Sequence, residues 1–145
     1  MKVPRSIYEE LLEHAREEAP NECCGLIGGS NGEARSVYRA RNAEASPLLY
    51  NLDPQDQIRI YGEIERNGEE LAAIYHSHTA SPAYPSQTDI NLALMDRREN
   101  DEVVGKEPIF PGVVYLIASL SDGERPLRGF EITEDGVREI DLAIE

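Results

Sequence analysis

The most constraining feature of the sequence is a short apolar segment, Leu71–Tyr75, that runs without a break into His76-Ser-His78. Such a run is typical of a buried strand, and the Ser-, Pro- and Tyr-rich residues after it indicate that the strand ends at a loop. Side chains of a strand alternate between its two faces, so His76 and His78 project from the same face. The chain is therefore expected to contain a sheet with two imidazoles at the end of a buried strand.

Three other segments predict helices from the spacing of their apolar residues. The first opens with the capping-box pattern Ser6–Glu9 and stops before Pro20. The second follows the start signal Asp53-Pro54 and ends near Asn67-Gly68. The third opens at Ser86 with a second cap-then-acid pattern. Its apolar residues are Ile90, Leu92, Leu94 and Met95.

Further strands are expected from short apolar runs separated by turn signals. They cover residues 24–28, 35–41, 113–120, 127–132 and about 140–144. The first two form a hairpin about Asn31-Gly32, and the last three form an antiparallel meander. Arg97–Pro111 is predicted to be a polar loop. The 145 residues contain no repeat and no linker, which favours one mixed α/β (α+β) domain over 1–145.

Composition excludes two classes of partner. Fourteen basic and 28 acidic side chains give a net charge of −14, which repels nucleic acid and anionic membrane surfaces. The longest apolar run, Gly112–Ala118, is far shorter than the roughly 20 residues of a membrane helix, and the N-terminus lacks the apolar core of a signal peptide. The adjacent residues Cys23 and Cys24 are poorly placed for an unstrained disulfide. We therefore expect a cytoplasmic protein with no nucleic-acid or membrane partner.

Asp89 completes a candidate metal site with the two histidines. It follows His78 by eleven residues, across a loop that can return a carboxylate to the strand end. Two imidazoles and one carboxylate are a ligand set for catalytic zinc, which keeps a fourth position open. Taken alone, each signal has a simpler explanation, because His-x-His often only marks a polar strand end and a first-turn Asp favours the helix dipole.

The joint pattern of His76-Ser-His78, Ser86 and Asp89 would arise by chance roughly once in several thousand chains of this length. It resembles the complete metal signature of the JAMM (MPN+) metallopeptidases, and Glu22 resembles their upstream glutamate. The resemblance extends over nearly the whole chain. It implies a mixed, mainly antiparallel curved sheet flanked by helices, and one zinc ion per chain held by His76, His78 and Asp89.

The resemblance also implies two catalytic roles. Glu22 would act as general base and then general acid, and Ser86 would help to stabilise the oxyanion. Without the resemblance, Glu22 is an exposed loop carboxylate and Ser86 is a helix cap. Cys24 is expected to be a small buried side chain behind the site, with Cys23 differing only in its exposure, and neither is assigned to zinc. His14, among glutamates of the first helix, is expected to be partly exposed and not a ligand.

Family resemblance extends to the substrate. Members usually act at the C-terminal Gly-Gly of a ubiquitin-like protein, whose tail lies extended along an edge strand. The segment His76–Ile90 looks most like the bacterial branch that frees cysteine from a sulfur-carrier protein in cysteine biosynthesis. A ubiquitin-like sulfur carrier is therefore the expected partner. An isopeptidase acting on modified lysines and a non-catalytic scaffold remain open alternatives, and so does the oligomeric state. Motifs of other zinc proteases and of serine hydrolases are absent.

Overall fold

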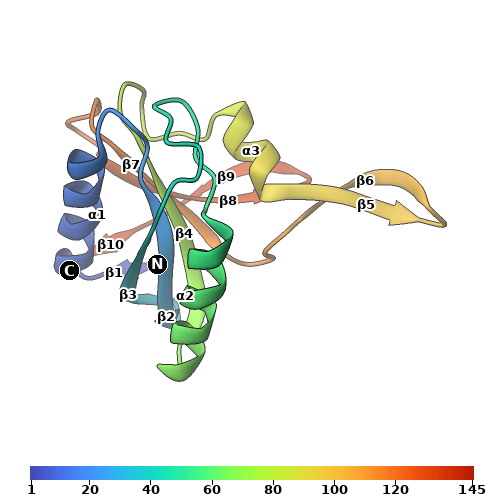
Figure 1. The fold of residues 1–145 in the computed structure, drawn as a ribbon, viewed down its shortest axis with the longest axis horizontal. Coiled ribbons are helices and arrows are strands. Elements are labelled where there is room, and N and C mark those ends of the chain that lie inside the picture. The colour runs from blue at the N-terminus through green and yellow to red at the C-terminus, as the bar shows by residue number, and fades with distance from the viewer.

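The computed structural model describes residues 1–145, and its largest element is a curled eight-stranded sheet (Figure 1). In chain order, its strands are β1 (Lys2–Val3), β2 (Cys24–Ser30), β3 (Glu33–Ala40), β4 (Glu70–His78), β7 (Val114–Ser119), β8 (Leu127–Thr133), β9 (Gly136–Ile140) and β10 (Ala143–Ile144). Their spatial order is β10-β1-β3-β2-β4-β7-β8-β9. Only the pairs β1–β3, β1–β10 and β4–β7 are parallel. This confirms the predicted mixed, mainly antiparallel sheet. The final meander is formed by β7, β8 and β9, and its last strand ends at Ile140, where the predicted strand was expected to begin.

Helices cover both faces of the sheet (Figure 1). They are α1 (Arg5–Glu18), α2 (Pro54–Arg66) and α3 (Gln87–Ala93). Apolar residues of α1 pack in one core with Ala73 and Tyr75 of β4, whereas those of α2 pack in a second core with Ile74. Because side chains alternate along a strand, His76 and His78 lie on the same face as Ile74. The histidine pair therefore belongs to the side of the sheet that α2 and α3 cover.

The starts of the helices follow the sequence signals in two cases out of three. Asp53 caps α2 by accepting a hydrogen bond from the Asp56 amide. Ser86 caps α3 in a full capping box. The predicted cap at Ser6 is wrong, because α1 begins at Arg5 and its N-cap is Pro4. Strand β1 ends at Val3, and the helix starts directly after it. None of the three helices has the length and apolar character needed to span a bilayer.

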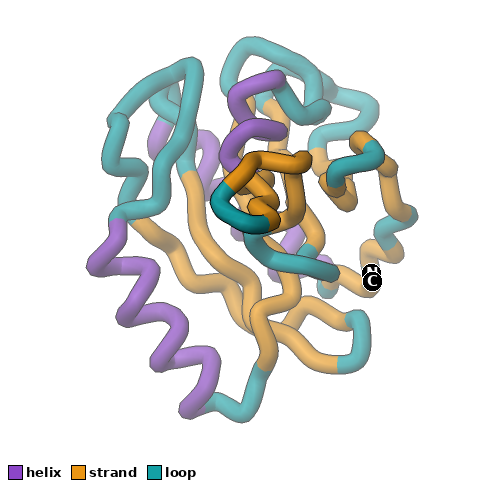
Figure 2. Tube along the Cα trace, turned by 90° about the vertical axis from the view of Figure 1, so that its right-hand side faces the viewer, coloured by secondary structure: helices purple, strands orange, loops and turns teal.

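The segment predicted as a polar loop, Arg97–Pro111, is instead mostly a β-hairpin. Strands β5 (Leu94–Glu99) and β6 (Glu102–Pro108) pair antiparallel in a sheet of their own. The turn residues Asn100 and Asp101 both have positive φ, 51° and 67°. Positive φ at both residues of a two-residue turn gives it a twist that matches the twist of the flanking strands. We call this hairpin the arm. It projects from one side of the molecule in Figure 1 and points toward the viewer in Figure 2.

The arm also shortens the third helix relative to the prediction. Helix α3 ends at Ala93, and Leu94 and Met95 belong to β5. Most side chains of both strands are solvent-exposed, so the sequence lacks the alternation of apolar and polar residues that marks a half-buried strand. This exposure is why the pattern favoured a loop.

The C-terminal strand predicted over about 140–144 is two strands. β9 ends at Ile140, and β10 pairs parallel with β1 at the opposite border of the sheet. Only Asp141 and Leu142 link them, so the two borders lie within the reach of three Cα–Cα steps, roughly 11 Å. Leu142 covers Gly129 of β8 so closely that a Cβ there would lie 2.9 Å from it. The curl of the sheet thus brings the end of β9 close to the start of β10.

Candidate metal centre

Three predicted ligands meet at the carboxyl end of β4. Nε2 of His76 lies 3.3 Å from Nε2 of His78, and Oδ2 of Asp89 lies 3.0 Å from each of these nitrogens. All three side chains are buried. The strand supplies two of them through its alternation, and the first turn of α3 supplies the third. The structure therefore brings together the His₂Asp set that the sequence pattern indicates.

The ligands are oriented by neighbouring groups. Nδ1 of His78 lies 2.8 Å from the carbonyl oxygen of Pro82; a proton on Nδ1 can be donated there, leaving the Nε2 lone pair free. The ring of His76 stacks on Tyr50, with centroids 4.2 Å apart and planes 18° apart. Oδ2 of Asp89 also accepts from the Ser86 amide at 2.9 Å. Each ligand is thus held by a contact outside the set.

The pKa shifts of His76 and Asp89 agree with the protonation states of metal ligands, whereas the hydrogen bond to Asp89 raises the pKa of His78 against the opposing effect of burial. Burial lowers the pKa of His76, which favours the neutral imidazole. Burial opposes the charge on Asp89, but hydrogen bonds from His76 and His78 hold its pKa well below the usual range. A carboxylate that stays ionised beside a neutral imidazole is the form in which both bind a metal ion.

Glu22 lies beside this set, two residues before the start of β2. It is 4% exposed, and its carboxylate belongs to the same group of side chains, whose ligand atoms all lie within 4.8 Å of one another. Oε1 is buried without a hydrogen-bond partner. Burial raises the pKa of Glu22 to about 7. A carboxylate in this state is suited to exchange a proton near neutral pH.

The donor set fits a tetrahedral ion such as zinc. Bonds of about 2.0–2.1 Å separate two ligands of a tetrahedral ion by roughly 3.3 Å, close to the measured 3.0 to 3.3 Å. Two nitrogens and one carboxylate oxygen are the ligand types of catalytic zinc sites. The unpartnered Oε1 of Glu22 points to a further group in the centre, since buried carboxylate oxygens are normally hydrogen-bonded.

The other residues singled out from the sequence have different positions. Oγ of Ser86 accepts from the Asp89 amide at 3.1 Å, as a helix cap does, and this leaves its own proton free. Cys24 is buried opposite His76 in the β2–β4 register, as expected. Cys23 is equally buried, so the expected difference in exposure is wrong. The two cysteines belong to the cores on opposite faces of the sheet, because they are consecutive on an extended segment.

His14 is also buried, contrary to the sequence-based expectation. It is 3% exposed, and its Nδ1 lies 2.8 Å from the hydroxyl of Tyr75. Burial, aided by Arg39, lowers its pKa to about 4. Tyr75 points to the α1 side of β4, so His14 lies on the face opposite the metal ligands. The partner that keeps it inside is 61 residues away, beyond the reach of helical periodicity.

An apolar pocket of about 270 Å³ borders the centre. Two of its lining residues come from the strand and the helix that carry the ligands. Ile74 precedes His76 by two residues on β4, and Leu92 follows Asp89 by about one turn of α3. Tyr50 lines the pocket and also stacks on His76. No motif in the sequence indicated Tyr50, because it lies in an irregular loop between β3 and α2.

The fold and the buried His₂Asp–Glu centre define the class of JAMM-type metallohydrolases. Within that class, the chain belongs to the family described as prokaryotic homologs of the JAB domain, whose model matches residues 4–130.

Named relatives and solved structures agree with this assignment. The chain is 35% identical over 140 residues to the CysO-cysteine peptidase of Mycobacterium tuberculosis, covering 94% of this chain and 86% of the relative. It is 37% identical over 145 residues to the desampylase of Haloferax volcanii, covering 94% and 91%. A solution structure from Desulfitobacterium hafniense has a TM-score of 0.81 at 33% identity, covering 100% and 93%. A JAMM structure described as a metalloprotease-like zinc site in the proteasome and signalosome shares the fold, with a TM-score of 0.57 at 16% identity, covering 100% and 97%.

Proposed function

We propose that this chain hydrolyses the amide bond after the C-terminal Gly-Gly of a ubiquitin-like sulfur-carrier protein and releases cysteine. The observation that carries the chemistry is the buried group of His76, His78, Asp89 and Glu22, with one carboxylate oxygen unpartnered. The likeness to a peptidase named for CysO-cysteine, over 94% of the chain, supports the substrate. The buried free thiols of Cys23 and Cys24 fit the reducing cytoplasm that we infer as its location.

We assign one zinc ion per chain to the centre, held by Nε2 of His76, Nε2 of His78 and Oδ2 of Asp89. Zinc at such a site supplies a lowered pKa for water, toward about 7, and polarisation of the scissile carbonyl. The neighbouring contacts of the ligands serve to aim them. The carbonyl of Pro82 fixes the ring of His78, and the Ser86 amide fixes the carboxylate of Asp89.

Glu22 moves the proton in this scheme. Oε1 accepts a proton from the attacking water as its oxygen bonds to the carbonyl carbon of the last glycine. The protonated carboxyl then delivers that proton to the leaving amine as the carbon–nitrogen bond breaks. The products are a carrier with a free C-terminal carboxylate and an amine, here the amino group of cysteine. Burial raises the pKa of Glu22 above that of a free carboxylate, which strengthens it as a proton acceptor.

Ser86 and the apolar pocket contribute to the substrate side. The Ser86 hydroxyl accepts a bond from the Asp89 amide, so its proton is available to the oxygen of the polarised carbonyl. The pocket between Ile74, Leu92 and Tyr50 offers an apolar surface on the same face of the sheet as the ligands. A small leaving group such as cysteine needs few contacts, so most of the binding surface serves the carrier.

A mass-spectrometric competition tests the leaving group. The carrier–cysteine adduct and the carrier linked through a lysine side chain are supplied at equal concentrations, with Glu22→Gln as the inactive control. We expect faster release of cysteine. The likeness to a desampylase makes the lysine-linked form the relevant competitor. Its cleavage at a tenfold higher rate, about 1.4 kcal/mol of transition-state preference, would establish the isopeptidase function instead.

A further inference from the structure

We propose that Asn42 is a positioning residue that holds Glu22 in place through a closed loop, residues 42–52. The inference rests on the proposed role of Glu22 as the proton-transferring group. Asn42 follows β3, makes its side-chain hydrogen bonds to backbone groups only, and carries no charge. Its effect on catalysis is therefore indirect and depends on hydrogen bonds.

The side-chain amide of Asn42 uses all of its hydrogen-bonding capacity. Nδ2 donates to the carbonyl oxygens of Glu22 at 3.1 Å and Leu49 at 3.0 Å. Oδ1 accepts from the amides of Glu44 at 3.1 Å and Asn51 at 2.9 Å. Two donors and two acceptors on one short side chain are available only from an asparagine. The pattern thus specifies this residue type at this position.

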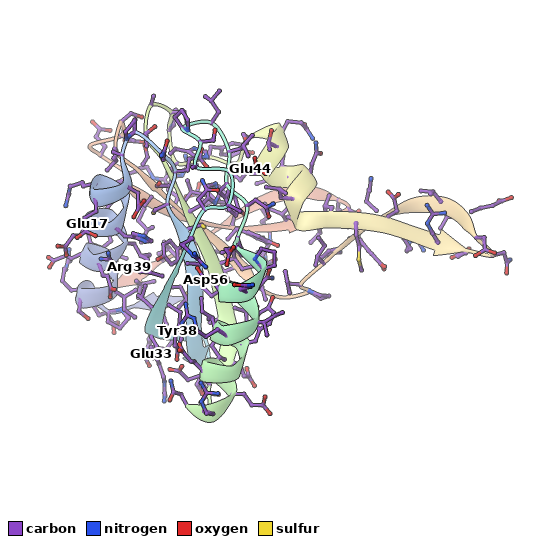
Figure 3. The ribbon with its side chains drawn as sticks, in the orientation of Figure 1. Glu17, Glu33, Tyr38, Arg39, Glu44 and Asp56 are labelled. Carbon is purple, nitrogen blue, oxygen red and sulfur yellow. The ribbon has the colours of Figure 1, made fainter.

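These bonds close the loop at its neck. The Ala43 amide donates to the carbonyl oxygen of Asn51 at 2.8 Å, and Asn42 forms a β-bridge with Leu52. Glu44, labelled in Figure 3, marks the first part of the loop between β3 and α2. The loop contains no helix or strand, so its shape depends on these bonds and on the Asn42 side chain.

The closed loop reaches the metal centre at two points. The carbonyl oxygen of Ser46 accepts from the Glu22 amide at 2.8 Å, and the ring of Tyr50 stacks on His76. Glu22 lies before the first residue of β2, so the sheet does not hold its backbone. Its amide is held by Ser46 and its carbonyl by Asn42. The same loop therefore holds both the backbone N–H and the backbone carbonyl of Glu22, while its Oε1 has no partner of its own.

The test separates the two halves of the Asn42 amide. Asn42→Asp keeps the acceptor oxygens for Glu44 and Asn51 but removes both donors, including the one to Glu22. Asn67→Asp is the matched control, because its amide donates to the Tyr38 hydroxyl outside the centre. We expect Asn42→Asp to retain about one zinc per chain and the KM of the unchanged protein, with kcat lowered about 10- to 100-fold, as a displaced reacting group predicts. The control should keep its kcat.

A readout without substrate makes the proposal independent of the proposed reaction. Amide hydrogen exchange of Glu22, followed by NMR, should accelerate at least about tenfold in Asn42→Asp, whereas the amide of Ile74 in β4 should not change. A kcat within twofold of the unchanged protein, or unchanged exchange at Glu22, would overturn the positioning role. Loss of zinc together with faster exchange at Ile74 would also overturn it, since Asn42 would then serve the fold as a whole. Failure of the unchanged protein to cleave the adduct would refute the proposed reaction. The hydrogen-exchange measurement would still test whether Asn42 holds the backbone of Glu22.

Discussion

The metal centre and the arm follow each other in the chain, yet they are stabilised in opposite ways. Asp89 is 3% exposed and is held by two imidazoles and the Ser86 amide. Three residues after the end of α3, Asp96 of the arm pairs with Lys106 in an exposed ion pair at 2.6 Å. Burial leaves no solvent to replace a lost partner, whereas water substitutes readily on the arm. The effect of a substitution should therefore depend on whether its polar partners are buried.

The largest effect is expected for the ligands. His76→Ala or Asp89→Ala should abolish zinc binding and reduce cleavage of the carrier adduct to background, because two ligands hold the ion far more weakly than three. Elemental analysis of the purified variants measures the first effect, and mass spectrometry the second. Full zinc occupancy in both variants would refute the ligand assignment.

Glu22→Gln separates proton transfer from metal binding within the same buried group. The amide has nearly the shape of the carboxylate but cannot accept the proton at Oε1. We expect about one zinc per chain and a kcat lowered by about 10²- to 10⁴-fold. Steady-state kinetics on the carrier adduct measure the change in kcat, and elemental analysis measures the zinc content. Unchanged turnover with zinc in place would show that another group is the base.

His14 extends the comparison to a buried polar group on the opposite face. Its pKa is about 4 when folded and 6.5 when unfolded, so the unfolded chain binds more protons between these pH values. Lowering the pH from 8 to 5 should therefore reduce the free energy of unfolding by up to about 2 kcal/mol through this residue.

Urea unfolding of His14→Gln at both pH values provides the control. The glutamine keeps a polar partner for the Tyr75 hydroxyl but does not titrate. The stability difference between the two proteins should shift by the same amount in favour of the variant at pH 5. An equal pH dependence in both would show that His14 is not the source.

The smallest effect is expected on the arm. Lys106→Ala removes the ion pair with Asp96, which should change the free energy of unfolding by less than about 0.5 kcal/mol and leave the zinc content unchanged. Thermal unfolding measures this change. A loss above about 1 kcal/mol would remove the contrast between the arm and the centre.

The sequence revealed the parts of the centre that depend on local geometry. Strand alternation places His76 beside His78, and the capping box of Ser86 fixes Asp89 within one helical turn. Glu22 was identified only through a family resemblance, because a loop carboxylate has no spacing rule of its own. Asn42 could not be recognised at all, since its four partners span residues 22 to 51 and belong to no periodic element.

The wrong predictions for the arm and for His14 have a common physical cause. The arm is solvated on both faces, so its strands carry no apolar alternation, and its turn at Asn100-Asp101 lacks the usual glycine. His14 was expected to be partly exposed because its charged neighbours are, although a single long-range partner keeps it buried. Patterns within a segment cannot report contacts that the tertiary fold creates.

The border strands of the sheet have a consequence for self-association. Border strands usually expose unpaired N–H and C=O groups on which another chain can add, and proteins must guard against such growth. Here the border strands β9 and β10 of the large sheet are short, five and two residues, and Asp141 and Leu142 join them directly. The outer edges of β5 and β6 are longer, six and seven residues. The charged side chains of Arg97, Arg98 and Lys106 on these strands discourage copies of the protein from aggregating edge to edge.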